Sequence, residues 1–216
     1  MWSAVLAALL FALVEGNAAD FSLNFTNTFS GTPPAGSPPS ITMLFQTVVP
    51  GTVDLVISNV GLIGTEFVSE LDFNLNTNLN PTSLQFTNFG GSGGFTLPTI
   101  TTGVDFSKAD GDGFYDIKFL FDSTAGGRFD GNDYVVYEIG GVAGLTAGDF
   151  AFLSAPAGGF GPFYAAAHVQ SIGNGDSGWI DADAITPFTI PEPGSGSILV
   201  VAAVLSLGRR FLFGRA

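Results

Sequence analysis

The chain has 216 residues and a formal net charge of −13, with 19 acidic residues against six basic ones and no cysteine. The absence of cysteine excludes disulfides and thiolate metal sites. So few Lys and Arg residues argue against nucleic acid and anionic membrane surfaces as partners, because phosphate groups are bound by clustered bases. The acidic balance is compatible with calcium or with neutral glycans.

The first residues have the pattern of a secretory signal peptide. Residues 2–14 form an almost unbroken apolar run, and Gly16, Ala18 and Ala19 provide small residues for cleavage. We therefore predict a signal helix over 1–19, with cleavage after Ala18 or Ala19. An uncleaved anchor is the alternative, but the run is shorter than the roughly 20 apolar residues of a membrane-spanning helix.

The central region, 20–187, has the composition of one all-β domain, since helix formers are scarce and β-branched and aromatic residues are common. Apolar and polar residues alternate along it, which predicts strands. We expect strands at 21–26, 42–49, 53–58, 71–80, 84–89, 114–121, 134–139, 150–154 and 163–171. One face of 114–121 is expected to hold four apolar side chains: Tyr115, Ile117, Phe119 and Phe121.

Turn-forming residues separate these segments. Asp-Gly pairs at 110–113 and 130–133 predict hairpin connections. Two Pro pairs in 32–40 and a Gly-rich run at 90–94 predict loops. We predict an antiparallel β-sandwich, jelly-roll-like, with one buried face in each sheet. A closed β-barrel is the alternative.

Three aspartates around one predicted turn form the candidate metal site. Asp110, Asp112 and Asp116 occupy alternate positions of a Gly-broken loop, and calcium prefers such oxygen ligands. The pattern is not an EF-hand, because Phe114 stands at the fifth position and no glutamate stands at the twelfth. A hairpin turn with exposed acids is the alternative, and residues 130–133 are a second, less complete candidate.

Aromatic side chains with a polar edge form the candidate glycan site. Trp179 and Tyr164, with Tyr134 and Tyr137, are the residues expected to stack on sugar rings. Packing inside or beside the core is the alternative role for the same side chains.

Catalysis finds little support in the sequence. His168 is the only histidine and lies in an apolar, strand-like stretch, which favours a structural role. Residues 90–94 match the G-x-S-x-G pattern, but no helix pattern follows them, as a nucleophile elbow requires. The domain has only three glutamates, Glu66, Glu70 and Glu138. We predict that the protein is not an enzyme. A secreted hydrolase with a pair of carboxylates, which have no fixed spacing, is an alternative.

The end of the chain combines a motif, an apolar segment and a basic terminus. Pro191-Glu192-Pro193 precedes an uncharged stretch, 194–208, and Arg209 and Arg210 follow. The run lacks the polar positions of an amphipathic core helix, so we predict a transmembrane helix with the arginines on the cytoplasmic side.

This tail resembles the PEP-CTERM sorting signal of exported bacterial proteins. The resemblance rests on Pro191, Glu192 and Pro193, the apolar segment, and Arg209 and Arg210. It implies that an exosortase-type membrane protease recognises the motif and removes the tail. It also implies a mature protein at the cell surface of a bacterium that makes extracellular polysaccharide.

Together these features predict an exported bacterial protein with a signal peptide (1–19), a β-sandwich domain (20–187) and a sorting signal (188–216). The precursor is held transiently in the inner membrane, and the mature form is at the cell surface or extracellular. We expect a non-catalytic surface or matrix component linked to exopolysaccharide or biofilm, without a cofactor other than calcium. A calcium-dependent glycan-binding module is the first alternative, and a secreted hydrolase is the second.

Overall fold

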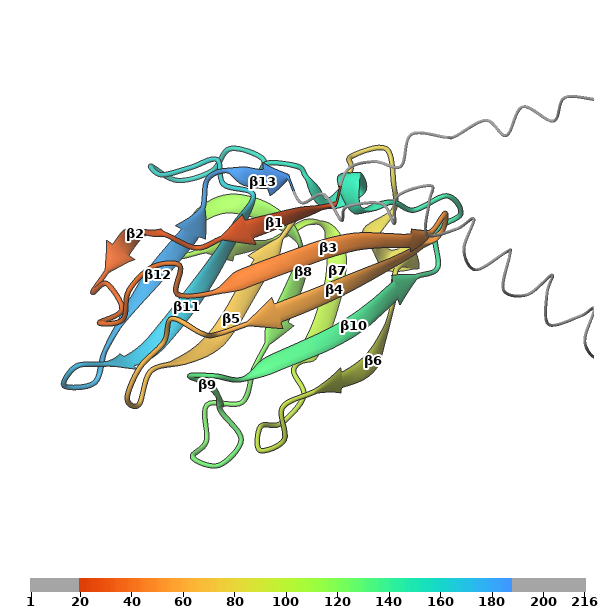
Figure 1. The fold of residues 1–216 in the computed structure, drawn as a ribbon. Helices are drawn as coiled ribbons and strands as arrows, with labels where there is room; N and C mark the ends of the chain where they lie inside the picture. Colours follow the sequence, from red (N-terminus) through yellow and green to blue (C-terminus); the bar gives the residue numbers. More distant parts are fainter. Residues whose placement is uncertain (1–19, 188–216) are drawn as a thin grey trace, which may run out of the picture.

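Alternating apolar side chains build two antiparallel sheets in a computed structural model, which describes residues 20–187. The first sheet has the strand order β13-β1-β3-β4-β10-β6 and lies at the front of Figure 1. Its strands are β1 (Phe21–Asn24), β3 (Thr42–Val49), β4 (Thr52–Ser58), β6 (Gln85–Gly91), β10 (Tyr134–Gly140) and β13 (Ile185–Pro187).

The second sheet has the strand order β2-β12-β11-β5-β8-β7, with the short β9 also paired to β5. Its strands are β2 (Asn27–Gly31), β5 (Phe67–Phe73), β7 (Thr99–Ala109), β8 (Asp112–Leu120), β9 (Phe129–Asp130), β11 (Ala165–Ile172) and β12 (Asp176–Ala182). Two short 3₁₀ helices, η1 (Pro81–Ser83) and η2 (Ala147–Phe150), connect strands.

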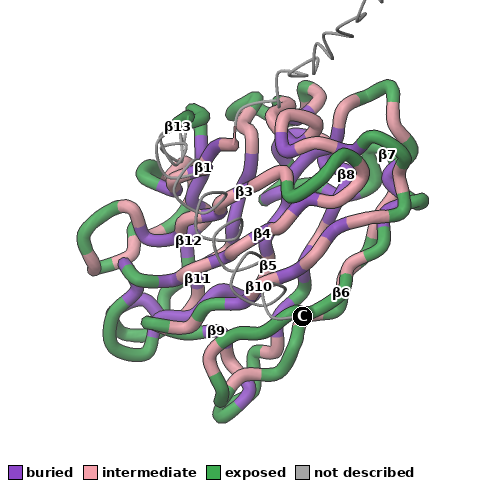
Figure 2. Tube along the Cα trace, turned by 45° about the vertical axis from the view of Figure 1, so that its right-hand side comes forward, coloured by how far each residue is buried: buried purple, intermediate pink, exposed green. Residues whose placement is uncertain are grey.

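The core lies between the sheets and is rich in phenylalanine. Phe45 of β3 is fully buried and stacks on Phe21 and on Phe150, each at a ring-centroid distance of 5.0 Å. It also meets Phe73 of the second sheet edge-on at 5.8 Å, and Phe73 lies 5.6 Å from Phe119. Buried and intermediate residues alternate along strands such as β4 and β10, as the colours of Figure 2 show, because one face of each strand points to the core. These aromatic contacts therefore join the two sheets.

The predicted all-β fold is confirmed, and its two packed antiparallel sheets form a β-sandwich. The predicted signal helix (1–19) and transmembrane helix (within 188–216) lie outside the described residues. Within 20–187, no helix has the length and apolar character needed to cross a bilayer.

Two predicted strands are wrong in extent. The strand expected over 71–80 ends at Phe73, because the Asn76 side chain accepts a hydrogen bond from the Asn78 backbone N at 3.0 Å and turns the chain. The segment 150–154 is not a strand. Phe150 ends η2, whose start is capped by hydrogen bonds between Thr146 and Asp149.

Two further expectations are wrong in detail. Tyr115 does not share the core with Ile117 and Phe119, since the pairing of β7 with β8 shifts register there and Tyr115 joins a separate apolar cluster. Residues 130–133 form a tight turn, but it is not a hairpin. The turn leads from β9 of the second sheet to β10 of the first, and these two strands do not pair.

Replacing Phe45 with Ala should lower the free energy of unfolding by about 3–5 kcal/mol, because a cavity replaces a ring that touches both sheets. Urea unfolding of the purified protein measures this loss. Phe89→Ala is the matched control, since Phe89 is 72% exposed, and its loss should stay within about 0.5 kcal/mol. Similar losses for both variants would show that the ring stack does not join the sheets.

Candidate functional site

A small second apolar cluster lies on the outer face of the second sheet. It consists of Ala109, Tyr115 and Ala166, with Phe29 and Trp179 packed against it. Ala166 stands between Ala165 and Ala167, which both face the main core, so Ala166 faces the other side. The second sheet therefore has buried residues on both faces.

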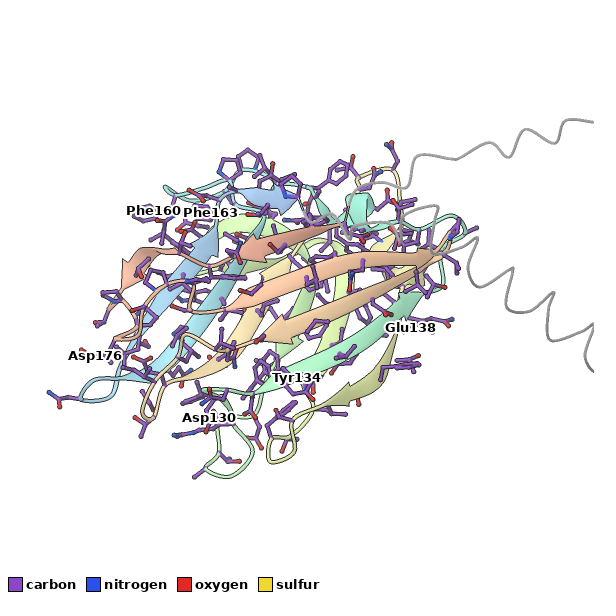
Figure 3. The ribbon with its side chains drawn as sticks, viewed as in Figure 1. Asp130, Tyr134, Glu138, Phe160, Phe163 and Asp176 are labelled. Carbon is purple, nitrogen blue, oxygen red and sulfur yellow. The ribbon has the colours of Figure 1, made fainter. Side chains whose placement is uncertain are left out.

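The loop 151–164 helps to enclose this outer cluster. It pairs with the open side of β8, where the Phe114 backbone N donates to the Ala155 carbonyl oxygen at 2.8 Å. Farther along, Phe163 and Phe160 pack against Phe29 of β2, with ring centroids 4.9 and 5.9 Å away. Figure 3 shows both side chains at the end of the molecule where β2 lies. The sequence analysis did not single out these three phenylalanines.

Asp112, one of the predicted calcium ligands, holds this loop in place. Its Oδ1 accepts hydrogen bonds from the backbone N of Gly159 at 2.5 Å and of Phe160 at 2.9 Å, and the residue is 5% exposed. Gly158 has a φ of +68°, and a Cβ there would lie 1.8 Å from the same oxygen. The close approach of the loop to Asp112 therefore requires glycine at position 158.

The other two predicted calcium ligands have different partners. The Asp110 carboxylate accepts a hydrogen bond from the Ser30 hydroxyl. The Asp116 carboxylate accepts from the backbone N of Asp105 at 2.9 Å and of Leu75 at 3.2 Å. The three aspartates thus have separate hydrogen-bond partners: a hydroxyl of β2, the backbone at two positions, and the loop 151–164. No three His, Cys, Asp or Glu side chains gather around a potential metal position anywhere in 20–187. The predicted calcium site remains a prediction.

The second acidic turn, 130–133, has a similar structural use. Asp133 accepts from the backbone N of Asp130 at 3.0 Å and from the Ser92 hydroxyl at 2.6 Å. Ser92 Oγ also accepts from the backbone N of Tyr134 at 3.0 Å. The serine of the G-x-S-x-G pattern therefore fixes a turn, and in the structure no helix follows it.

The structure does not bring the two predicted sugar-stacking residues together. Trp179 packs against the outer cluster, whereas Tyr164 packs against the main core. The Trp179 ring lies parallel to the His168 ring at a centroid distance of 4.7 Å, and the Phe29 ring lies 6.4 Å away at an interplanar angle of 41°. One face of the Trp179 ring is therefore occupied by His168, and Tyr164 does not join Trp179 in a common stacking surface.

His168 has the environment of a structural histidine. Its Nδ1 lies 3.1 Å from the hydroxyl of Ser69, which also accepts from Gln170 Nε2 at 3.0 Å. Burial lowers the pKa of His168 from its ordinary value, and the charges of Glu70 and Asp110 oppose this change. His168 is thus held in its neutral form between the ring of Trp179 and a hydroxyl group.

A buried acid, Asp72, lies on the same outer face and was not singled out from the sequence. It has no exposed surface, and Glu70, two residues earlier on β5, forms an ion pair with Lys118 of β8. The buried oxygens of Asp72, Ser107 and Tyr115 have no hydrogen-bond partner of regular geometry within 20–187. Burial and the charge of Glu70 raise the pKa of Asp72 to about 8, although Ser107 and Lys118 lower it in part.

Asp72 therefore holds a proton at neutral pH. A protonated acid beside a charged carboxylate is the arrangement of a general acid–base pair. Because Asp72 is fully buried, a substrate does not reach this pair, and we assign it to packing of the outer face. The spacing of Glu70 and Asp72 at alternate strand positions was the only sequence signal for this contact.

The predicted sorting residues, Pro191, Glu192, Pro193, Arg209 and Arg210, lie outside the described residues. No family model, curated protein or solved structure matches the chain.

The buried Asp72 should make the protein less stable as pH rises. Native Asp72 binds its proton up to about pH 8, whereas the unfolded residue loses it near 3.8. The native state thus binds more protons between these values, and the free energy of unfolding falls as pH increases. The pKa of Asp181 is also raised, to about 6, so its effect on the free energy of unfolding ends near that pH. Urea unfolding from pH 6.5 to 8 should therefore show a decline that Asp72→Asn removes.

Asp176→Asn, at the exposed first residue of β12 (Figure 3), is the matched control and should retain the decline. An unchanged pH dependence in Asp72→Asn would show that Asp72 is ionised in the native state.

Asp112→Ala should lower the free energy of unfolding by about 1–3 kcal/mol, because two backbone N–H groups lose their acceptor. Asp112→Asn retains the Oδ1 acceptor and should lose less. Hydrogen exchange at Gly159 and Phe160 should become faster in Asp112→Ala only. Equal exchange rates at these two amides in both variants would show that Asp112 does not anchor the loop.

Proposed function

We propose that this protein is an exported bacterial surface or matrix component whose tail is removed at Pro191-Glu192-Pro193 by an exosortase-type membrane protease. The domain 20–187 is the mature, non-catalytic part, and its sandwich is jelly-roll-like. The signal peptide brings the chain across the inner membrane, and the apolar tail holds it there until it is processed. The final location is the cell surface or the extracellular matrix, in association with exopolysaccharide or biofilm.

The pairing of β1 with β13 is the structural observation that supports this proposal best. Phe21 and Pro187 are directly opposite partners in these antiparallel strands. The chain therefore enters and leaves the domain at the same point of one sheet edge. A domain joined in this way can be folded while both flanking segments are attached to the same membrane, and cutting either one leaves the strand pair intact.

The first residue after the predicted signal peptide already belongs to the fold. Asp20 Oδ1 accepts a hydrogen bond from the Thr47 backbone N at 2.8 Å. Cleavage after Ala19 keeps this contact. At the other end, β13 stops at Pro187, and the motif begins at Pro191. Both proposed cuts thus lie just outside the hydrogen-bonded domain.

The charge of the domain supports an extracellular role beside neutral polymers. Residues 20–187 carry 17 acidic side chains and three basic ones, Lys108, Lys118 and Arg128. Lys118 is already paired with Glu70. Such a surface repels polyanions and remains soluble at the cell exterior. It leaves no cluster of bases for nucleic acid or acidic lipid.

Replacing Pro191, Glu192 and Pro193 with Ala in the native host should retain the protein in the membrane fraction at full tail length. The wild-type protein should instead lose its tail and appear at the surface or in the medium. Immunoblotting of the cell fractions, with an epitope inserted in the exposed loop 32–40, measures the distribution.

Pro33→Ala, a proline substitution in that loop, is the matched control and should behave as wild type. Normal release of the triple variant would refute processing at this motif.

A further inference from the structure

An open groove lies between the free edges of the two sheets. β6 is the last strand of the first sheet and β7 the last strand of the second. A cavity of about 430 Å³ is lined by residues of both edges and of β10: Leu84, Phe86, Asn88, Leu97, Pro98, Ile100, Thr102 and Tyr137. Its size is in the range of small-molecule sites. The core is thus accessible from solvent at this edge.

Polar groups line the groove at positions where other strands carry apolar side chains. Phe86 and Ile100 pack against the main core, and Asn88 and Thr102 follow them two residues later on the same faces. Asn88 uses its side-chain N to donate to the Gly90 and Val136 carbonyl oxygens, at 3.2 and 3.3 Å. Its side-chain oxygen and the Thr102 hydroxyl remain as groups directed toward the groove edge.

Tyr137 adds the most informative polar group. The residue is only 3% exposed, yet it lines the groove, and its ring packs between Phe86 and Phe119 at 6.4 and 5.3 Å. Burial is the only cause that raises its pKa, to about 12, and no hydrogen-bonding residue contributes. A neutral phenol donor is therefore held rigidly at the groove without a partner within 20–187. This hydroxyl is not among the fully buried oxygens that lack a partner, so a ligand in the groove can accept its hydrogen bond.

The absence of charged residues in the groove lining argues against an ionic ligand. None of the eight lining residues is charged, so the site offers no counter-ion to an ionic ligand. The net negative charge of the domain disfavours anions. Phe86, Leu97 and Pro98 provide apolar surface beside three hydrogen-bonding groups. This combination fits a ring with an apolar C–H face and a rim of hydroxyl groups.

The edge strands are poorly suited to the other common occupant, an added peptide strand. β6 shifts register against β10 between Val136 and Tyr137, and Gly90 has a φ of +153°. β7 shifts register between Thr102 and Ser107. Such irregularities interrupt the regular row of N–H and C=O groups that strand addition requires.

We propose that the groove between β6 and β7 is a binding site for neutral saccharides, with the Tyr137 hydroxyl as a hydrogen-bond donor. The site goes beyond the sorting proposal and does not depend on it, because the groove residues are remote in sequence from the tail. It differs from the predicted Trp179 platform and needs no calcium.

Isothermal titration calorimetry of the purified full chain tests this site. The protein is kept in lauryldimethylamine oxide, a detergent without a sugar headgroup, and titrated with cellohexaose, isomaltohexaose and the acidic hexamer of galacturonate. At least one neutral hexamer should bind with 1:1 stoichiometry and the acidic one should not. Tyr137→Phe, which removes one hydroxyl and keeps the ring, should weaken binding about tenfold. Thr102→Val should also weaken saccharide binding.

Tyr134→Phe is the matched control, since Tyr134 is on the same strand, is 45% exposed and does not line the groove (Figure 3). It should bind as wild type. Absence of binding to both neutral hexamers, or equal affinity of Tyr137→Phe and wild type, overturns the proposal. So does binding of the strand-forming peptide Thr-Val-Thr-Val-Thr-Val without saccharide binding, which would assign the groove to peptides. Urea unfolding confirms that each variant is folded.

Discussion

The packing of phenylalanine rings between the two sheets is the interaction on which the rest of the structure depends. Phe45 contacts Phe21 on its own sheet and Phe150 of η2, and it meets Phe73 across the core. Without cysteine, no disulfide contributes to the stability of this domain. Buried aromatic area therefore has to provide the stabilisation that many small secreted domains obtain from cross-links.

Polar side chains are buried at two places outside the core between the sheets. On the outer face of the second sheet, Asp72 and Asp112 are buried because the loop 151–164 and Phe29 cover part of that face. At the β6–β7 edge, Tyr137 is buried as a ring but presents its hydroxyl to the groove. The acids lie on a face that the loop covers, whereas the Tyr137 hydroxyl borders an open groove of about 430 Å³. This difference in accessibility is why we assign a ligand to the groove and not to the acids.

The sequence was informative where periodicity and turn chemistry act locally. The strand at 42–49 and the turn at 110–113 are found as predicted, the latter with positive φ at both Asp110 and Gly111. Strands β2, β7 and β12 were missed, because Gly, Thr and Ser dilute their apolar pattern and tertiary pairing decides them. The groove could not be predicted at all, since its residues are brought together by two sheet edges rather than by spacing along the chain.

The central claim is that the domain is the mature product of an exported precursor cut outside the β1–β13 pair. Intact mass of the protein recovered from membrane and medium fractions of its native host tests it most directly. The account predicts a form that begins near Asp20 and ends at or near Pro191-Glu192-Pro193. A protein that retains its C-terminus through Ala216 in the membrane fraction, with none in the medium, would contradict it. Such a result would identify a permanently anchored domain.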